Sequence, residues 1–432
     1  MATRIFMTGE SGDHNLGDEG QALASACRLR RYFPDAHIVS TGIDPLGAIL
    51  RHQTQVVPWP MSPWELDHSR AQKVTRRIAQ KLGANEDFLD PAGRRMEAIF
   101  DEQYRRNAQF RSVVEHVKQA DFVFDMGHGA LNDVFDPFMI CFLYYLAGRF
   151  GKPLFVSGQS IGPLWRPRSI KMVRDTLAHA HTVGLRDKDV SYQVLVEQVG
   201  VDANRVRLVE IGDDTLDLVA KEPAWEAFPP CLADILQSGE FFAVQWRSSD
   251  YTQAVTSTAQ IVPLAEAIQC LHEATRLPAV FMAFSWELGS SDVLAATRLY
   301  NYLQGRVPFY VVWNYQEATE LKWLLGRARF GIGLSYHFHV FLLTQGVPPI
   351  GLSTNAYYDI KLRGAYTAYG HKLAPLSYPQ GLCNTQAFQV AIETVTGWTE
   401  ADRQRLTIAA DGMRDSWHRA FQTFLRDERL MA

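Results

Sequence analysis

The stretch Gly331-Ile332-Gly333-Leu334-Ser335-Tyr336-His337-Phe338-His339-Val340 decides the fold, together with its continuation Gly346-Val347-Pro348-Pro349-Ile350. An apolar run stops at small residues, an amphipathic segment follows, and a second apolar run begins after one glycine. This order predicts a strand, a helix and a strand. His337 would then lie between the carboxyl end of a strand and the amino end of a helix, where open α/β sheets bind ligands and helix N–H groups attract anions. A buried structural histidine is the alternative interpretation.

The N-terminal half alternates between strand and helix patterns. Short apolar runs that end in polar or glycine-rich loops predict strands at residues 4–8, 37–41, 121–125, 153–157, 182–185 and 207–211. Amphipathic segments between them predict helices, for example from about Gln21 and at 138–147. Alternation of this kind favours a parallel sheet with helices on both faces.

The C-terminal half repeats the alternation after a boundary rich in proline and glycine at about 219–239. Strands are expected at 241–245, 279–284 and 309–313, and the opening stretch follows them. We therefore expect an N-terminal Rossmann-like domain at 1–220 and a second at 221–400. A helical segment at 401–432 would pack back across the domains. The predicted fold class is α/β, with two doubly wound, Rossmann-like domains facing a cleft in the layout of a GT-B glycosyltransferase.

Several loops at predicted strand ends carry glycine and polar residues. They are 9–20, the Gly-His-Gly at 127–129, 158–164, and Arg186-Asp187. Glycines let backbone N–H groups approach a ligand closely, and Asn15 or Asp18 can cap the helix that follows. Plain polar loops, and a simple ion pair between Arg186 and Asp187, are the alternatives.

Composition indicates a folded soluble protein without a nucleic-acid partner. The chain has 432 residues, 47% of them hydrophobic, and a net charge of −4, so it lacks the basic field that nucleic acids require. Five scattered cysteines without a CxxC pair and the lack of an apolar run of about 20 residues favour a cytoplasmic location. A basic run between Arg70 and Lys81 is either a solvated helix face or a contact for an anionic acceptor or a membrane surface.

The loops, taken in order, resemble those of the polysaccharide pyruvyl transferase family. The matching residues, over about 4–370, are Asn15-Leu16-Gly17-Asp18-Glu19, Gly127-His128-Gly129, Gly158-Gln159-Ser160-Ile161-Gly162-Pro163-Leu164, Arg186-Asp187 with Ser191, Arg247, Ser335-Tyr336-His337 with Gly346-Val347-Pro348, and Tyr358-Asp359-Ile360-Lys361 with Gly364. Each motif is weak alone, and the resemblance rests on their common order.

The resemblance implies transfer of the enolpyruvyl-derived group of phosphoenolpyruvate to two hydroxyls of a saccharide, giving a pyruvate ketal in cell-surface polysaccharide biosynthesis. Phosphoenolpyruvate would be a co-substrate, and no cofactor or metal is implied. The expected catalytic residues are His337, Asp18 and Glu19. Donor binding is expected from Arg186, Arg247, Ser335, Tyr336, His337 and Lys361, and acceptor binding in the N-terminal half from Asn15, Gly17, Asp18, His128 and Gln159.

The sequence departs from the family pattern at Ser335, where the family motif has an arginine. Losing a bidentate charge weakens anion binding unless Arg247, Lys361 or His339 replaces it. A transferase that uses another donor, such as a nucleotide sugar, and a non-catalytic glycan-binding relative therefore stay open. So do a lipid-linked acceptor with peripheral membrane contact and a homo-oligomer.

Overall fold

The structure of the chain, a computed structural model, describes residues 2–9, 15–42, 45–52, 54–58, 92–248, 258–287, 290–312, 317–382 and 385–430. The chain forms two compact units. Unit 1 consists of residues 1–13, 25–214 and 416–432, and unit 2 of residues 14–24 and 215–415. Two of the limits between the units fall within helices, one in α1 (Leu16–Tyr32) and one in α17 (Glu400–Asp427).

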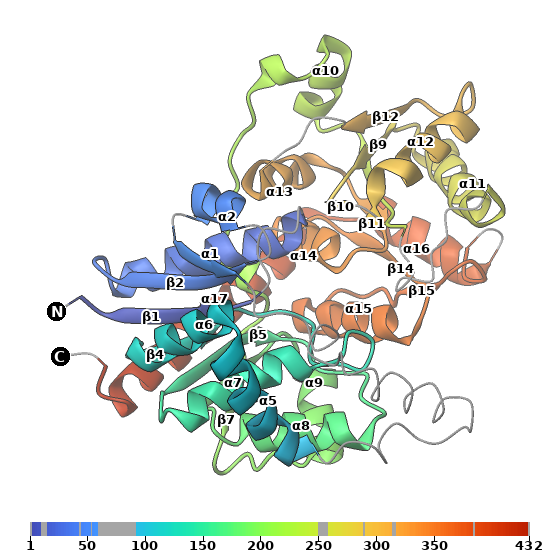
Figure 1. Cartoon of the computed structure of the whole chain (residues 1–432). Helices are drawn as coiled ribbons and strands as arrows, with labels where there is room; N and C mark the ends of the chain where they lie inside the picture. Colours follow the sequence, from blue (N-terminus) through green and yellow to red (C-terminus); the bar gives the residue numbers. More distant parts are fainter. Residues whose placement is uncertain are drawn as a thin grey trace. The chain divides into compact units, whose positions relative to one another are not determined.

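Unit 1 is built on a parallel sheet, several strands of which are labelled in Figure 1. Its described strands follow the order β3-β2-β1-β4-β5-β6-β7. The strands are β1 (Arg4–Thr8), β2 (His37–Gly42), β3 (Gln55–Pro58), β4 (Phe122–Asp125), β5 (Leu154–Gln159), β6 (Thr182–Leu185) and β7 (Arg207–Glu210). The central strands are buried along their whole length, as expected for a parallel sheet covered on both faces.

The helices of unit 1 cover the sheet with apolar faces. They are α2 (Pro45–His52), α5 (Ala92–Arg106), α6 (Ala108–Gln119), α7 (Phe138–Arg149), α8 (Pro167–Leu177) and α9 (Val190–Gln193), which continues as a π-helix, η2 (Val194–Val199). The α6 helix begins where Asn107 accepts a hydrogen bond from the Phe110 N–H, and it buries Val113 and Val117. The end of α17 adds Trp417, Phe421 and Phe424 to this core.

Unit 2 contains a second parallel sheet, with the described strand order β12-β9-β8-β13-β14-β15. Its strands are β8 (Phe242–Gln245), β9 (Ala279–Met282), β12 (Phe309–Val312), β13 (Gly331–Gly333), β14 (Pro349–Ser353) and β15 (Leu376–Ser377). A short antiparallel hairpin joins β10 (Trp286–Glu287) to β11 (Ser290–Ser291). In both sheets the order reverses beside the first strand, as in the Rossmann fold.

The helices of unit 2 include one that is buried on all sides. They are α10 (Pro230–Ser238), α11 (Thr258–Thr275), α12 (Asp292–Leu303), α13 (Ala318–Arg327), α14 (Tyr336–Thr344), α15 (Ala356–Tyr369) and α16 (Gln386–Thr396), with 3-10 turns η3 (Asp214–Asp217) and η4 (Trp225–Ala227). Residues 336–343 of α14 are all buried. Its sequence, YHFHVFLLT, is apolar around the whole helix, which is the pattern of a core helix.

The expected fold class is confirmed: two α/β units with parallel sheets, and the strand, helix and strand predicted around His337 are β13, α14 and β14. The sequence did not predict β3, β15 or the β10–β11 hairpin. The first helix begins at Leu16, earlier than expected, and residues 15–24 belong to unit 2 and not to an N-terminal domain of 1–220. The basic run at 70–81 lies outside the described residues.

Candidate active site

Four of the motif segments follow the strands at which each sheet reverses its order, whereas residues 158–164 lie at the end of β5 and Arg186-Asp187 follows β6. In unit 1 these strands are β1 and β4, and in unit 2 they are β8 and β13. Open α/β sheets bind ligands at the carboxyl ends of such strands, because the flanking loops diverge there. The residues at these two points are therefore the first candidates for an active site.

In unit 2, the amino end of α14 is held against β8 by a side chain. Gln245 accepts hydrogen bonds through Oε1 from the N–H groups of Leu334 (3.3 Å) and Ser335 (2.8 Å). Ser335 is the N-cap residue of α14, and its hydroxyl makes no capping bond. The first turn of α14 thus presents backbone N–H groups at this point, together with the positive end of the helix dipole.

Arg247 lies at the same end of β8 in a buried ion pair with Asp292. Its Nε is 3.3 Å from Asp292 Oδ1, and its Nη2 lies 3.4 Å from Asn15 Oδ1. Gln245 Nε2 also donates to Asp292, at 3.0 Å. Burial raises the pKa of Asp292, and the Arg247 guanidinium opposes that shift. Arg247 is thereby fixed beside the strand end that carries α14.

Lys361 provides a second cation near α14. It is buried, donates a hydrogen bond to the Tyr357 hydroxyl, and its Nζ lies 5.5 Å from the centre of the Tyr336 ring. Tyr336 opens α14, so this ammonium group is close to the first turn.

His339 cannot supply the charge that Ser335 lacks. Its Nε2 is bonded to the Gly333 carbonyl (3.0 Å) and its Nδ1 to the Tyr366 hydroxyl (3.1 Å). Burial lowers the pKa of His339 to about 3, so the imidazole is neutral at physiological pH. It is a structural histidine of the core, whereas Arg247 and Lys361 are the cations near this helix end.

The Asn15–Glu19 motif lies in unit 2 beside His337. Asn15 Oδ1 accepts a hydrogen bond from the Gly17 N–H (3.2 Å), as the cap of α1, and Asn15 Nδ2 donates to Asp18 (2.7 Å). A Cβ atom added to Gly17 would lie 1.9 Å from His337 Nδ1, so only glycine fits there. The motif was expected in an N-terminal acceptor domain; the structure instead groups Gly17 and Asp18 with the candidate donor residues.

In unit 1, Asp125 is the centre of a buried polar cluster at the end of β4. It accepts hydrogen bonds from the hydroxyls of Thr8 and Tyr144 and from Gln159 Nε2 (2.5 Å). His128 Nε2 lies 3.3 Å from Asp125 Oδ1. The other ring nitrogen, Nδ1, accepts the Ala130 N–H at 3.3 Å, which places the proton of the neutral imidazole on Nε2. This carboxylate–imidazole pair has the composition of a general base.

Arg186 also lies in unit 1, where it forms an ion pair with Asp213 (2.9 Å) and donates to the Gly158 carbonyl (2.7 Å). Asp187 is not its counter-ion. It instead accepts the N–H groups of Val190 and Ser191 and the Ser191 hydroxyl, which fixes the start of α9. The expected Arg186–Asp187 pair is therefore wrong, although Arg186 does form a buried ion pair.

The glycine loops of unit 1 pack backbone against backbone. A Cβ atom on Gly127 would lie 2.5 Å from the Gly158 carbonyl oxygen, and one on Gly158 would lie 2.9 Å from that of Gly212. Gly158 has a φ of +28° and Gly162 of +94°, both unfavourable for other residues. These close approaches explain why the loops after β4, β5 and β7 carry glycine.

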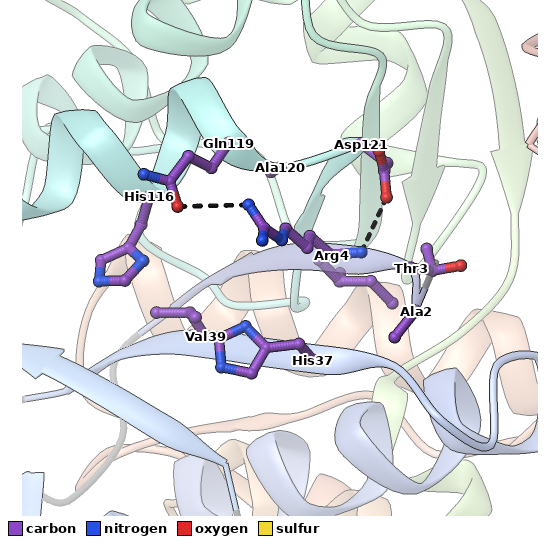
Figure 2. Close-up of a pocket in the computed structure, with 10 residues that line it drawn as sticks. Ala2, Thr3, Arg4, His37, Val39, His116, Gln119, Ala120 and Asp121 are labelled. Atoms are coloured by element: carbon purple, nitrogen blue, oxygen red, sulfur yellow. Dashed lines mark hydrogen bonds between the residues drawn. The ribbon is translucent and has the colours of Figure 1, made fainter.

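A cavity of about 750 Å³ lies at the amino ends of strands of the unit 1 sheet. Figure 2 shows the residues that line it. Arg4, His37 and Asp121 line it, at or beside the amino ends of β1, β2 and β4, and His116 lines it from α6. Arg4 donates to Gln119 (3.5 Å), and its backbone N–H to Asp121 (2.8 Å). Because the motif loops lie at the carboxyl ends, we do not assign this cavity to the reaction.

The predicted site residues thus form two groups, one in each unit. Unit 2 holds Asn15, Gly17, Asp18, Glu19, Arg247, Ser335, Tyr336, His337 and Lys361, and unit 1 holds His128, Gln159 and Arg186. Sequence reasoning missed Asp125, Asp292 and Gln245 as site residues. The signal for Asp125 was a carboxylate directly after a buried Phe-Val-Phe strand and before the Gly-His-Gly loop.

Two negative findings concern the described part of the chain. Among those residues, no group of three or more His, Cys, Asp or Glu side chains is arranged to hold a metal ion. None of the helices described there has the length and apolar character needed to cross a membrane.

A family model described as polysaccharide pyruvyl transferase matches residues 15–355 of the chain. A comparison with curated proteins finds no match.

Solved structures of sugar-nucleotide enzymes have a similar fold. A UGT transferase from Siraitia grosvenorii in complex with UDP is 10% identical, with 99% of this chain and 100% of that chain covered and a TM-score of 0.56. A UDP-GlcNAc 2-epimerase from Neisseria meningitidis bound to UDP-GlcNAc is 11% identical, with 98% and 100% covered and a TM-score of 0.55. At these identities the likeness concerns the fold alone, which is of the GT-B type.

Proposed function

Because the chain belongs to the polysaccharide pyruvyl transferase family, we propose that it transfers the enolpyruvyl-derived group of phosphoenolpyruvate to two hydroxyls of a saccharide, forming a pyruvate ketal. The observation that carries the proposal is the pair of cations, Arg247 and Lys361, near the amino end of α14 in unit 2. His337 lies in the first turn of that helix.

Phosphoenolpyruvate carries a phosphate and a carboxylate, so its site must neutralise two anionic groups. A helix N-terminus with a guanidinium and an ammonium group beside it offers such neutralisation. In this proposal Arg247 and Lys361 take over the role of the family arginine that Ser335 replaces. Ser335 contributes its hydroxyl, because its N–H is bonded to Gln245, and Tyr336 contributes a backbone N–H group of the first turn.

The proposed reaction consumes one phosphoenolpyruvate and two hydroxyl groups. The methylene carbon of the donor gains a proton and becomes a methyl group, while the first sugar oxygen bonds to the neighbouring carbon. The second sugar oxygen then bonds to the same carbon, and the bond between this carbon and the phosphate oxygen breaks. Of the two hydroxyl protons, one accounts for the proton that the methyl group has gained, and the other leaves with the released phosphate. We assign His337 as the acid for this transfer.

The acceptor base in this proposal is His128, oriented by Asp125. The sugar hydroxyl gives its proton to Nδ1, which releases its 3.3 Å hydrogen bond from the Ala130 N–H, and the Asp125 carboxylate near Nε2 stabilises the imidazolium that forms. Asp18 and Glu19 were the other candidates for this role. Both lie in the first turn of α1, and Asp18 is bonded to Asn15, which in turn accepts a hydrogen bond from Arg247. We therefore assign this turn to positioning Arg247 and not to deprotonating the acceptor.

Arg186 is the weakest donor candidate of the set. Its Nε is already engaged by Asp213 and Gly158, so donor binding through this residue would rely on the rest of the guanidinium. We also propose a cytoplasmic location, because phosphoenolpyruvate is a metabolite of that compartment, and leave open a lipid-linked acceptor.

The test is titration of phosphoenolpyruvate by calorimetry, followed by a phosphate-release assay with a panel of mono- and disaccharides. Wild type should bind the donor and, with an acceptor, release phosphate. Arg247→Gln and Lys361→Met should weaken donor binding about tenfold or more, since each removes one charge from an anion site. Arg363→Gln is a matched control: this exposed arginine lies on α15, two residues from Lys361, and pairs with Asp359.

The alternatives predict different outcomes of the same titration. Saturable binding of UDP-glucose without binding of phosphoenolpyruvate, even with acceptors present, would favour a nucleotide-sugar transferase; Ser335 is the residue that motivates it. Glycan binding without turnover of either donor, unchanged in His337→Ala and Arg186→Ala, would point to a non-catalytic relative.

A further inference from the structure

Two loops of unit 1 form a rigid ribbon that leads from the Asp125 cluster to the surface. The loop after β4 and the loop after β5 run side by side: the Ser160 N–H donates to the His128 carbonyl (3.3 Å) and the Gly162 N–H to the Leu131 carbonyl (2.9 Å). The Asp133 N–H continues the ladder by donating to the Pro163 carbonyl (2.9 Å).

The far end of this ribbon is fixed by Asp133. The buried Asp133 carboxylate accepts the backbone N–H groups of Trp165 (2.5 Å) and Arg166 (2.7 Å) through the same oxygen, Oδ2. Gln198 adds a hydrogen bond to the Leu164 carbonyl. Charge-assisted bonds to successive N–H groups hold the backbone of Trp165 in one conformation.

Trp165 is nevertheless exposed to solvent over 57% of its surface, and Phe135, on the other loop of the ribbon, over 42%. A single exposed apolar residue is ordinary on a protein surface. A tryptophan whose backbone is fixed by a buried carboxylate is a different case, because the rigid loop pre-orders a large flat surface for a ligand. The guanidinium carbon of Arg166 lies over the indole, 5.9 Å from the ring centre, and so places hydrogen-bond donors close to the ring.

We propose that the indole of Trp165 is a stacking surface for a sugar ring of the acceptor, in a subsite separate from the hydroxyls that react. The inference rests on the proposed function for its saccharide. A sugar ring has an apolar C–H face that packs on an aromatic plane, and hydroxyls at its rim that bond to groups such as Arg166. Ser160, which is bonded to His128, and Trp165 are five residues apart, so at most about 18 Å of chain separates them.

This position predicts that the subsite selects for oligosaccharides over monosaccharides. The ring on Trp165 would be a neighbour of the ring that reacts at His128, so loss of the indole should weaken binding of longer acceptors while leaving the chemical step intact.

The test compares wild type, Trp165→Ala, Trp165→Phe and Tyr300→Ala on an array of immobilised mono- to hexasaccharides of glucose, galactose, mannose and N-acetylhexosamines. Tyr300 is the matched control, an aromatic residue of unit 2 that is 43% exposed. We expect wild type to bind a subset of the oligosaccharides. Trp165→Ala should bind them about tenfold less tightly, Trp165→Phe should retain part of the affinity, and Tyr300→Ala should match wild type.

Two further measurements separate this inference from the proposed function. With phosphoenolpyruvate and a glycan that supports phosphate release, Trp165→Ala should raise KM for the oligosaccharide and leave kcat unchanged. An unchanged KM would overturn the inference and leave the pyruvyl transfer standing. Glycan binding through Trp165 without any phosphate release would support the inference and contradict the proposed pyruvyl transfer.

Other results would also overturn the inference. These are the absence of wild-type binding to every glycan on the array, and equal binding by wild type and Trp165→Ala. Binding to vesicles containing phosphatidylglycerol that is abolished in Trp165→Ala, with glycan binding unaffected, would make Trp165 a membrane contact instead.

Discussion

At the scale of single residues, the closest constraint in the site is that between Gly17 and His337. A methyl group at position 17 would overlap the imidazole, with its carbon 1.9 Å from Nδ1 and 2.8 Å from the His337 Cβ. The histidine must therefore move, and its Cβ cannot rotate away. We expect Gly17→Ala to lower kcat/KM for phosphate release about 100-fold, the usual cost of a misplacement near 1 Å. Gly412→Ala, where an added Cβ meets nothing within 4 Å, should retain full activity.

The Asp125–His128 pair provides a second test at this scale. If His128 is the acceptor base, His128→Gln should lower kcat by roughly 10²- to 10⁴-fold and leave donor affinity intact, because the donor-binding residues proposed above are different ones. Asp125→Asn should cost nearly as much, and the double variant little more than either single one, since the two groups act as a unit. Additive losses in kcat, or a fall in donor affinity, would argue for a purely structural cluster. Melting curves must accompany these assays, because Asp125 also holds Thr8 and Tyr144.

At the scale of elements, α14 and α15 are joined to β14 by two neutral histidines. His339 bonds to Tyr366, while Tyr366 and His371 both bond to the Pro349 carbonyl. Burial lowers the pKa of His339 to about 3 and that of His371 to about 4. Since the unfolded chain takes up these protons below about pH 6.5, the stability they confer is complete above that pH and declines as the pH falls toward the folded-state values.

The free energy of unfolding should therefore decline by up to about 1.4 kcal/mol per pH unit for each of the two histidines between pH 6 and pH 4. Urea denaturation at several pH values measures this slope. His371→Gln should remove the contribution of one histidine from this slope. His37→Gln, at an exposed position, is the control and should leave the slope unchanged. A variant slope equal to that of wild type would contradict the assignment of His371 as a buried neutral group.

The elements were also the level at which sequence was most informative. Short apolar runs indicated the buried strands, and the strand, helix and strand pattern of residues 331–350 placed His337 at the start of α14. The sequence could not reveal that Asn15–Glu19 belongs to unit 2, because a helix such as α1 can pack its amino end against either sheet. The pairing of Arg247 with Asp292 and the meeting of Asp125 with Thr8 depend on strand order, which local patterns do not contain. Ser335 shows one further limit of the sequence. It stands where the family has an arginine, and only the three-dimensional structure shows that the cations Arg247 and Lys361 lie near this position.

At the scale of the whole molecule, unit 1 depends on residues from the end of the chain. Trp417 is fully buried there, stacks on Phe421 with ring centres 4.9 Å apart, and donates to the Ser157 hydroxyl at 2.8 Å. Arg28 lies over its ring at 4.4 Å and forms a buried ion pair with Asp214. The last helix therefore closes a core whose other parts come from residues 1–13 and 25–214.

This arrangement predicts that unit 1 cannot reach its full stability until residues 416–432 are present. We expect Trp417→Ala to lower the free energy of unfolding by about 3–5 kcal/mol, because it creates a cavity and removes the ring on which the Arg28 guanidinium packs. Trp417→Phe should cost less, because it keeps most of the ring packing and loses only the indole N–H and part of the cation–π interaction. Ile408→Ala, 69% exposed on the same helix, should change stability by less than about 0.5 kcal/mol. A chain that ends at residue 415 but shows wild-type urea unfolding would refute this dependence, because the apolar surface left by Trp417, Phe421 and Phe424 would then have no energetic consequence.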